Sequence, residues 1–277
     1  MNKAKLRTNK NKAFYRLGLW FLLLITIVLA GTAGFKAVKQ SVWNGKDRLS
    51  LIALSGDRIE LINLIPSQKK QLIWEVPSDL VVEVPSGYGP YQLKKVFTLG
   101  ELDKKGGELL LKTTSNLFGL KVSAYRVEGK TNLSWWDSLR INWLNRTKAY
   151  QTSRLDLSGQ MGRIDQIVNE SLFDQVIARE AVPVAVLNAT GVAGEANQVA
   201  RLITNLGGQV VTIGNSEAGQ DESEIWIVSD DLKSSVTLAF LESITGTKNV
   251  KVEPKAIQYR ADIVVIVGKR YAVLPSK

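Results

Sequence analysis

The sequence predicts an α/β protein, with the separated helices and strands of an α+β fold, in which one membrane-spanning helix precedes two small domains. Three observations support this. Residues 17–35 contain no charged side chain, short β-rich runs separated by turns begin after residue 47, and the last hundred residues alternate as strand, helix, strand, strand, helix, strand. The chain has 277 residues, 45% of them hydrophobic and 22% charged, which is enough for two small domains.

The uncharged stretch at residues 17–35 would extend about 28 Å as a helix, which is enough to cross the hydrocarbon core of a bilayer. Six Lys and Arg residues and no acidic residue precede it. Such a basic flank stays on the cytoplasmic side. We therefore expect a cytoplasmic arm at 1–16, a transmembrane helix at 17–38, and the bulk of the chain outside the cell membrane. A cleaved signal peptide, ending at the small residues 31–33, is one alternative, and a buried core helix is another.

Composition excludes several classes of function. Beyond residue 16, 30 Lys and Arg residues face 26 Asp and Glu residues, so the outer part has a net charge of only +4 and no nucleic-acid partner is expected. The chain contains no Cys and no His. Disulfides, thiol nucleophiles, Ser-His-Asp triads and imidazole or thiolate metal sites are therefore impossible. We expect no resident metal and no cofactor.

The first β-rich region gives the expected elements in order. Apolar, β-branched runs at 49–54, 58–64, 71–76 and 80–84 predict strands, because Gly, Pro, Ser and Asp separate them. Residues 108–118 predict a helix that Gly119 ends, and residues 121–127 predict a further strand.

This order of elements, with the runs DRLSLIAL, IELINLIP, WEVPSDLVVEVPSGYG and FGLKVSAYRVEG, resembles the first half of the LytR-CpsA-Psr (LCP) catalytic domain. The resemblance implies an LCP-like domain at 47–150. Members of that family transfer glycopolymers from a polyprenyl-pyrophosphate carrier to the cell wall. Asp47 stands where the family has an Asp before its first strand. Pro77-Ser78-Asp79 replaces the family's Pro-Arg-Asp turn.

The missing arginine makes this region a degenerate relative, because a Ser hydroxyl does not neutralise a pyrophosphate as a guanidinium does. We assign no catalytic residue. Asp47 and Asp79 are vestigial candidates that would hold Mg²⁺ only if the LCP-like site is active. Their alternative role is hydrogen bonding in turns.

Two helices are expected between the halves. Ser134 and Asp137 predict a capping-box start for a helix over 134–148, and its Trp136, Leu139, Trp143 and Leu144 form an apolar stripe. We expect this stripe to pack on its own domain, and the alternative is contact with the outer membrane face or wall polymer. A helix over 163–179, within a connecting segment at 160–181, presents Ile164, Ile167, Val168, Leu172 and Val176 on one side.

Residues 182–273 resemble the LytR C-terminal domain, on the motifs LNATG at 187–191, LGG at 206–208 and ADIVVIVG at 261–268. The resemblance and the element order imply a βαββαβ domain with two helices on one face of a sheet. Asn188, Thr190, Gly191 and Gly194 are candidate ligand-binding residues, because they precede a helix N-terminus. The alternative is a purely structural turn. By analogy with SPOR domains of this layout, the open sheet face is a second place to look for peptidoglycan binding.

These observations predict a membrane-anchored, extracytoplasmic protein of the bacterial cell envelope that binds or scaffolds wall components without catalysis. Its expected partners are the membrane, through the N-terminal helix, together with peptidoglycan or wall glycopolymer and other envelope proteins. An active LCP-type transferase is the first alternative, and a transcription regulator is the second.

Overall fold

The first domain is built on a six-stranded sheet with the strand order β7-β6-β1-β2-β3-β8. The computed structural model describes residues 20, 21, 23, 25, 26, 28, 31, 32 and 34–271. Neighbouring strands are antiparallel, except that β1 is parallel to β6 and β3 is parallel to β8. The strands are β1 (Leu49–Ser55), β2 (Arg58–Ile65), β3 (Lys70–Val76), β6 (Ala124–Val127), β7 (Lys130–Thr131) and β8 (Gln151–Asp156).

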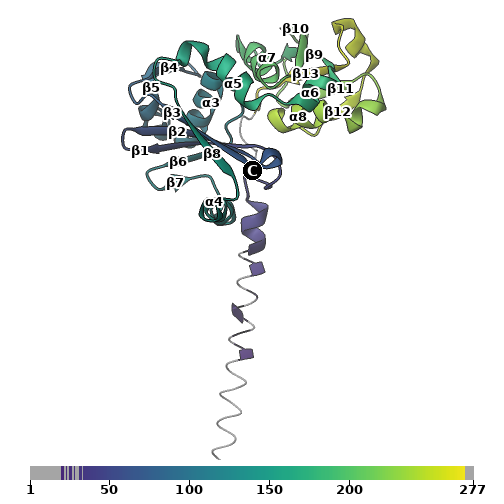
Figure 1. Cartoon of the computed structure of the whole chain (residues 1–277). Coiled ribbons are helices and arrows are strands. Elements are labelled where there is room, and N and C mark those ends of the chain that lie inside the picture. The colour runs from purple at the N-terminus through teal and green to yellow at the C-terminus, as the bar shows by residue number, and fades with distance from the viewer. Residues whose placement is uncertain are drawn as a thin grey trace, which may run out of the picture.

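Both faces of this sheet are covered, which explains the continuous apolar character of β1. Ile52 and Leu54 pack with the residues of α3 (Gly106–Phe118) in one buried cluster, whereas Leu49 and Leu51 pack in another with Ile141 of α4 (Trp135–Thr147). Figure 1 shows α3 and α4 on opposite sides of the strands. The side chains of a strand alternate between faces, so each helix receives every second residue of β1.

The expected elements of this domain are largely present, with two differences. The helix after residue 106 ends at Gly119, whose φ of +56° is the left-handed conformation expected of a glycine cap. The run at 80–84 forms β4 (Val81–Val84), but it pairs only with β5 (Gly89–Gln92) in a separate hairpin. The main sheet continues past residue 150, because β8 pairs with β3. The short helix α2 (Val96–Glu101) precedes α3.

The expected single helix over 163–179 is wrong, because two helices occupy this segment. They are α5 (Ile164–Leu172) and α6 (Gln175–Glu180). Phe173 adopts an extended backbone, and the Asp174 carboxylate then accepts hydrogen bonds from the amides of Val176 and Ile177, at 2.9 and 3.3 Å. This N-cap starts a new helix in a new direction. Val176 is consequently exposed, and Ile177 is the buried residue.

The second domain is a five-stranded sheet in the order β10-β9-β13-β11-β12, with α7 and α8 on one face. The βαββαβ order is present, and the sequence reading missed only the short strand β12. The elements are β9 (Pro183–Asn188), α7 (Glu195–Asn205), β10 (Gln209–Asn215), β11 (Glu224–Ile227), α8 (Val236–Thr245), β12 (Val250–Val252) and β13 (Ile263–Val267).

The other face of this sheet is not open, contrary to expectation. The 3₁₀ segment η5 (Pro254–Tyr259) covers it, with Ala256 fully buried against a cluster that includes Leu187, Val264 and Ile266. All five residues of β13 are buried, as expected of a central strand covered on both faces. A flat sheet surface for a wall ligand is therefore absent from this part of the described chain.

The two domains share one continuous hydrophobic cluster that runs from Ile52 in β1 to Val267 in β13. Polar contacts close the junction beside it. Asn205 of α7 donates a hydrogen bond from Nδ2 to the carbonyl oxygen of Gly119 at 3.1 Å. Arg201 donates to the carbonyl oxygens of Asn116 and Leu117 and pairs with Asp165. The domains therefore form one packed body, as Figure 1 shows.

The N-terminal segment leaves this body beside α4 (Figure 1). The expected arm at 1–16 lies outside the described residues, and so does much of the expected transmembrane helix at 17–38. Within the residues that are described, none of the helices combines the length and the apolar character needed to cross a membrane.

Candidate binding cavity between the two domains

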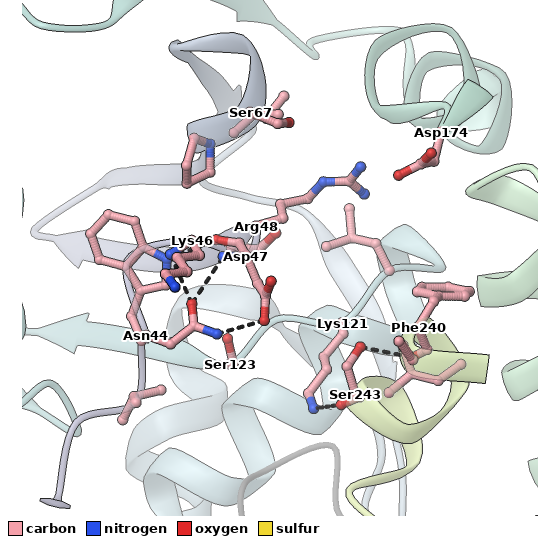
Figure 2. A pocket seen from close by; sticks show the side chains of 18 of the residues that line it. Asn44, Lys46, Asp47, Arg48, Ser67, Lys121, Ser123, Asp174, Phe240 and Ser243 are labelled. Atoms are coloured by element: carbon pink, nitrogen blue, oxygen red, sulfur yellow. Dashed lines mark hydrogen bonds between the residues drawn. The ribbon is translucent and has the colours of Figure 1, made fainter. Parts of the chain in front are cut away.

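A cavity of about 900 Å³ lies where the N-terminal segment, the first sheet and α8 meet. Its lining combines basic side chains with an apolar wall, and it draws residues from both domains (Figure 2). The lining residues used below are Lys46, Asp47, Arg48, Ser67, Lys121, Ser123, Trp136, Arg140, Asp174, Val236, Phe240, Ser243 and Ile244.

One wall is the turn that leads into β1. Asn44 organises it, because its side-chain oxygen accepts hydrogen bonds from the amides of Lys46 and Asp47, both at 2.9 Å. Its Nδ2 donates to the Asp47 carboxylate at 2.6 Å, as Figure 2 shows. The Trp43 indole donates to the carbonyl oxygen of Asp47 at 2.8 Å. This turn fixes the backbone while the Lys46 side chain stays exposed.

Arg48 extends from the start of β1 toward the second half of the chain. One Nη donates to the carbonyl oxygen of Leu172 at 2.8 Å, and the guanidinium points toward Asp174 (Figure 2). Burial lowers the pKa of Arg48, and the negative charge of Asp174 partly offsets this effect. Its Nε is buried and has no protein partner among the described residues. Arg48 therefore carries one buried donor that no described residue satisfies.

Lys121 occupies the opposite side, in the segment before β6. Its ammonium donates to the carbonyl oxygen of Ser243 in α8, so it bridges the two domains (Figure 2). Burial lowers the pKa of Lys121 to about 8. A desolvated ammonium without a carboxylate partner gains most from a ligand that brings a negative charge.

The remaining walls are apolar or aromatic. Val236, Phe240 and Ile244 of α8 line one side, and Trp136 of α4 contributes its ring. The Arg140 guanidinium lies over the rings of Trp43 and Trp136, with its carbon 5.1 and 5.8 Å from their centroids. An arginine held between two aromatic faces has little freedom to move.

The lining thus carries four basic groups, on Lys46, Arg48, Lys121 and Arg140, against the carboxylates of Asp47 and Asp174. This charge suits an anionic group, and the α8 wall suits an apolar body next to it. Hydroxyl groups are present on Ser67, Ser123 and Ser243, but the chain has no imidazole to activate them. The described residues contain no cluster of three or more metal-ligating side chains.

The structure separates the two vestigial acidic candidates. Asp47 precedes the start of β1, whereas Asp79 follows the end of β3, and these two strands run in the same direction through β2. The two residues therefore lie at opposite ends of the strands, about 20 Å apart along a seven-residue strand. Asp47 lines the cavity and Asp79 does not. The two residues do not form a shared site for a cation.

The turn after β9 brings Asn188, Thr190, Gly191 and Gly194 together, but its polar groups bond to one another. Asn188 Nδ2 donates to the carbonyl oxygen of Val192 at 2.7 Å, and its Oδ1 accepts from the Thr190 amide and hydroxyl at 3.0 and 2.7 Å. Gly191 and Gly194 have φ values of +77° and +90°. The geometry supports the structural role that the sequence offered as the alternative.

Sequence reasoning found only Asp47 among the polar residues of the cavity. Arg48, Lys121 and Arg140 were missed because they are isolated basic residues in three different elements, with no shared motif. The one usable signal was Arg140, which lies one helical turn after the capping residue Asp137. The packing of the first domain brings these three basic residues to one cavity, and the docking of the second domain adds the α8 wall.

Comparison with known proteins bears first on the second domain. Residues 181–271 match the family model described as LytR cell envelope-related transcriptional attenuator. This segment is a LytR C-terminal domain. The match begins two residues before β9 and ends four residues after β13, so the family's unit coincides with the five-stranded sheet and its two helices. It confirms the resemblance read from the sequence. A comparison with curated proteins finds no match.

Several solved structures also match. Bacillus subtilis TagT is 23% identical over 30% of this chain and 33% of its own, with a TM-score of 0.26. The LytR-CPS2A-psr family protein YwtF (TagT), with bound octaprenyl pyrophosphate lipid, is 23% identical over 30% and 34%, also at 0.26. TagT bound to LIIa-WTA is 14% identical over 62% and 79%, again at 0.26.

The chain thus spans about a third of the length of the first two structures. They belong to the family that the sequence of the first half resembles. Because these TM-scores are low, the LCP-like character of the first half rests on its sequence and not on these structures. The LytR C-terminal domain contributes α8 and Ser243 to the cavity, and the first domain contributes Lys46, Arg48 and Lys121.

Proposed function

We propose that this protein is a membrane-anchored, extracytoplasmic component of the cell envelope that binds wall glycopolymer without catalysis. The observation that carries the proposal is the LytR C-terminal domain at 181–271, whose family model is described as cell envelope-related. The uncharged stretch at 17–35 behind a basic arm supports anchoring, with the C-terminal bulk outside the membrane. Other envelope proteins are further candidate partners.

The cavity between the domains is the proposed binding site. Many wall glycopolymers are phosphodiesters, so they present anionic groups at regular intervals, and the exposed Lys46 and the desolvated ammonium of Lys121 suit such a group. No resident cofactor is proposed. Because the cavity needs α8 from one domain and the turn at 43–48 from the other, binding would depend on the docked arrangement.

Co-sedimentation of the full chain, in detergent, with isolated cell walls tests this proposal. We expect the chain to pellet with intact walls and to stay in solution when the anionic polymers have been removed by acid. Lys46→Glu reverses an exposed charge at the cavity and should lower the pelleted fraction. Lys105→Glu changes an exposed lysine at the start of α3, away from the cavity, and should leave it unchanged. If the chain does not pellet with intact walls, the proposal is contradicted.

An active LCP-type transferase is the principal alternative. It requires release of phosphate from a polyprenyl-pyrophosphate glycan in the presence of Mg²⁺, with loss of that activity in Asp47→Asn. The separation of Asp47 from Asp79 does not favour it.

A transcription regulator is the second alternative, and it requires a cytoplasmic C-terminus. A reporter fused after residue 277 distinguishes that topology from the one proposed here.

A further inference from the structure

Helix α4 carries an exposed apolar stripe that its own domain does not cover. Trp135, Leu139 and Trp143 recur every four residues, and their side chains are 54, 52 and 60% exposed. Residues at this spacing lie along one side of a helix, here over about 12 Å. The buried residues of α4 are Asp137 and Ile141, on its other side. The expectation that the Trp-rich stripe packs inside the domain is therefore wrong for Leu139 and Trp143, whereas Trp136 and Leu144 are half-buried.

The charges of α4 favour an anionic surface opposite this stripe. Asp137 is the last acidic residue before Asp156, and its side chain is fully buried. Arg146 and Lys148 are exposed at the C-terminal end of the helix, and no ion pair of the described residues includes either of them. An exposed stripe of Trp and Leu next to basic residues is typical of helices that lie in the headgroup region of a bilayer.

The position of α4 is fixed by the end of the N-terminal segment. The Asp137 carboxylate accepts hydrogen bonds from the Ser41 hydroxyl and, at 3.0 Å, from the Val42 amide. Arg140 pairs with the same carboxylate at 2.8 Å and donates to the carbonyl oxygen of Trp43. In Figure 1, α4 lies at the end of the body from which the N-terminal segment departs. A membrane crossed by residues 17–38 would meet the body at this end.

We propose that α4 lies on the outer leaflet of the membrane, with Trp135, Leu139 and Trp143 among the lipid headgroups and Arg146 and Lys148 facing anionic lipid. The inference rests on the proposed anchoring and adds a second membrane contact to it. Two contacts, fixed to each other through Asp137, hold the body in one orientation. The cavity, which includes Trp136 and Arg140 of the same helix, then opens close to the membrane surface.

Site-directed spin labelling tests the contact, because the chain has no native cysteine. The full chain carries the label at Leu139→Cys, or at Leu102→Cys as the matched control, since Leu102 is a leucine with 79% exposure on another helix end. Each protein is reconstituted in vesicles of phosphatidylcholine and phosphatidylglycerol. Collision rates are measured with oxygen, which partitions into lipid, and with a water-soluble nickel complex.

We expect the label at position 139 to gain oxygen collisions and lose nickel collisions several-fold on reconstitution, whereas the label at 102 stays accessible to nickel. Equal nickel access at both positions, in a chain that resists alkaline carbonate extraction, would overturn the α4 contact and leave the anchor standing. Extraction by carbonate would overturn the anchoring itself. Shielding of position 139 from both reagents already in detergent would point to a protein partner and reject the lipid contact. None of these outcomes depends on wall binding.

Discussion

Glu180 shows how a single exposed side chain joins the connector to the second domain. It is the last residue of α6, and its carboxylate accepts hydrogen bonds from the Ser235 hydroxyl, the Val236 amide, and the amide and hydroxyl of Thr237, at 2.6–2.8 Å. These donors lie in the first turn of α8, where backbone amides have no partner within the helix. A residue from a distant part of the chain thus completes the cap that Ser235 begins.

This cap predicts a pH dependence of stability. Burial alone would raise the pKa of Glu180, but the hydrogen bonds from Thr237, Val236 and Ser235 lower it to about 2, from an ordinary value of 4.5. A lowered pKa in the folded state adds stability that is complete above the ordinary value and is lost as the pH falls through about 2. We expect Glu180→Gln to lower the free energy of unfolding by about 1 kcal/mol at pH 7.

Urea unfolding of both proteins at pH 7 and at pH 2.5 measures this difference, which should shrink at the lower pH. Glu217→Gln, at an exposed position in the loop after β10, is the control and should change neither value. A difference between wild type and Glu180→Gln that is the same at both pH values would show that the charge has no part in the cap.

At the scale of the element, α4 is held by one buried charge. Desolvation raises the pKa of Asp137, but hydrogen bonds from Ser41, Val42 and Ser134 outweigh this and lower it, so the carboxylate stays ionised. It closes the capping box with Ser134 and pairs with Arg140. The helix and the segment at 41–43 therefore share one polar anchor point.

We expect Asp137→Asn to destabilise the protein by about 3 kcal/mol, because Arg140 loses its ion pair in a largely buried place. Hydrogen exchange should rise in both α4 and residues 41–48 and stay unchanged in α7. Asp231→Asn, in an exposed turn before α8, is the matched control. If exchange rose in α4 alone, the link between the helix and the N-terminal segment would be disproved.

The contrast between α3 and α4 shows what the sequence could predict. The glycine cap of α3 and the capping box of α4 are local signals, and both were read correctly. The buried side of α4 was read correctly only in part, because Asp137 and Ile141 are buried and Trp136 and Leu144 are half-buried, whereas Leu139 and Trp143 are exposed. Sequence patterns place polar residues outside and apolar residues inside, so they misplace a buried aspartate and an exposed tryptophan. Two of the donors to Asp137 are residues 41 and 42, about a hundred positions away along the chain, and no local pattern reveals them.

At the scale of the whole molecule, the decisive feature is the junction where Gly119 meets α7. A Cβ at Gly119 would lie 2.5 Å from Asn205 Nδ2 and 3.0 Å from Arg201 Nε. Both side chains are held by Asp165, so neither moves away without losing hydrogen bonds. Because Gly119 has no side chain, α7 of the second domain can pack closely against the end of α3.

We expect Gly119→Ala to destabilise the protein by about 3 kcal/mol, of which about 1 kcal/mol reflects the left-handed backbone and the rest the lost junction contacts. Gly129→Ala isolates the backbone cost, since Gly129 has a φ of +87° and no atom within 4 Å of the added Cβ. Thermal unfolding of the three proteins measures both effects. Equal losses for the two variants would mean that the junction contributes nothing at Gly119.

The features that depend on tertiary packing, which are the cavity and the covered sheet face, could not be predicted from the sequence. The motifs of the second domain were sufficient to identify its family, because the residues within each motif are adjacent in the chain. The cavity was not found, because Arg48, Lys121 and Ser243 come from segments whose meeting depends on the shared core. The covered sheet face was missed for the same reason, since η5 has no repeating pattern that reveals what it packs against.

The central place of β1 has a mechanical consequence. This strand directly follows the N-terminal segment, and it is hydrogen-bonded on one side to β2 and on the other to β6. Tension applied through the N-terminus would reach the first sheet at β1, which leaves the sheet only when the ladders on both of its sides break. A sustained pull on the N-terminus would therefore unfold the first sheet only after both of these ladders had broken.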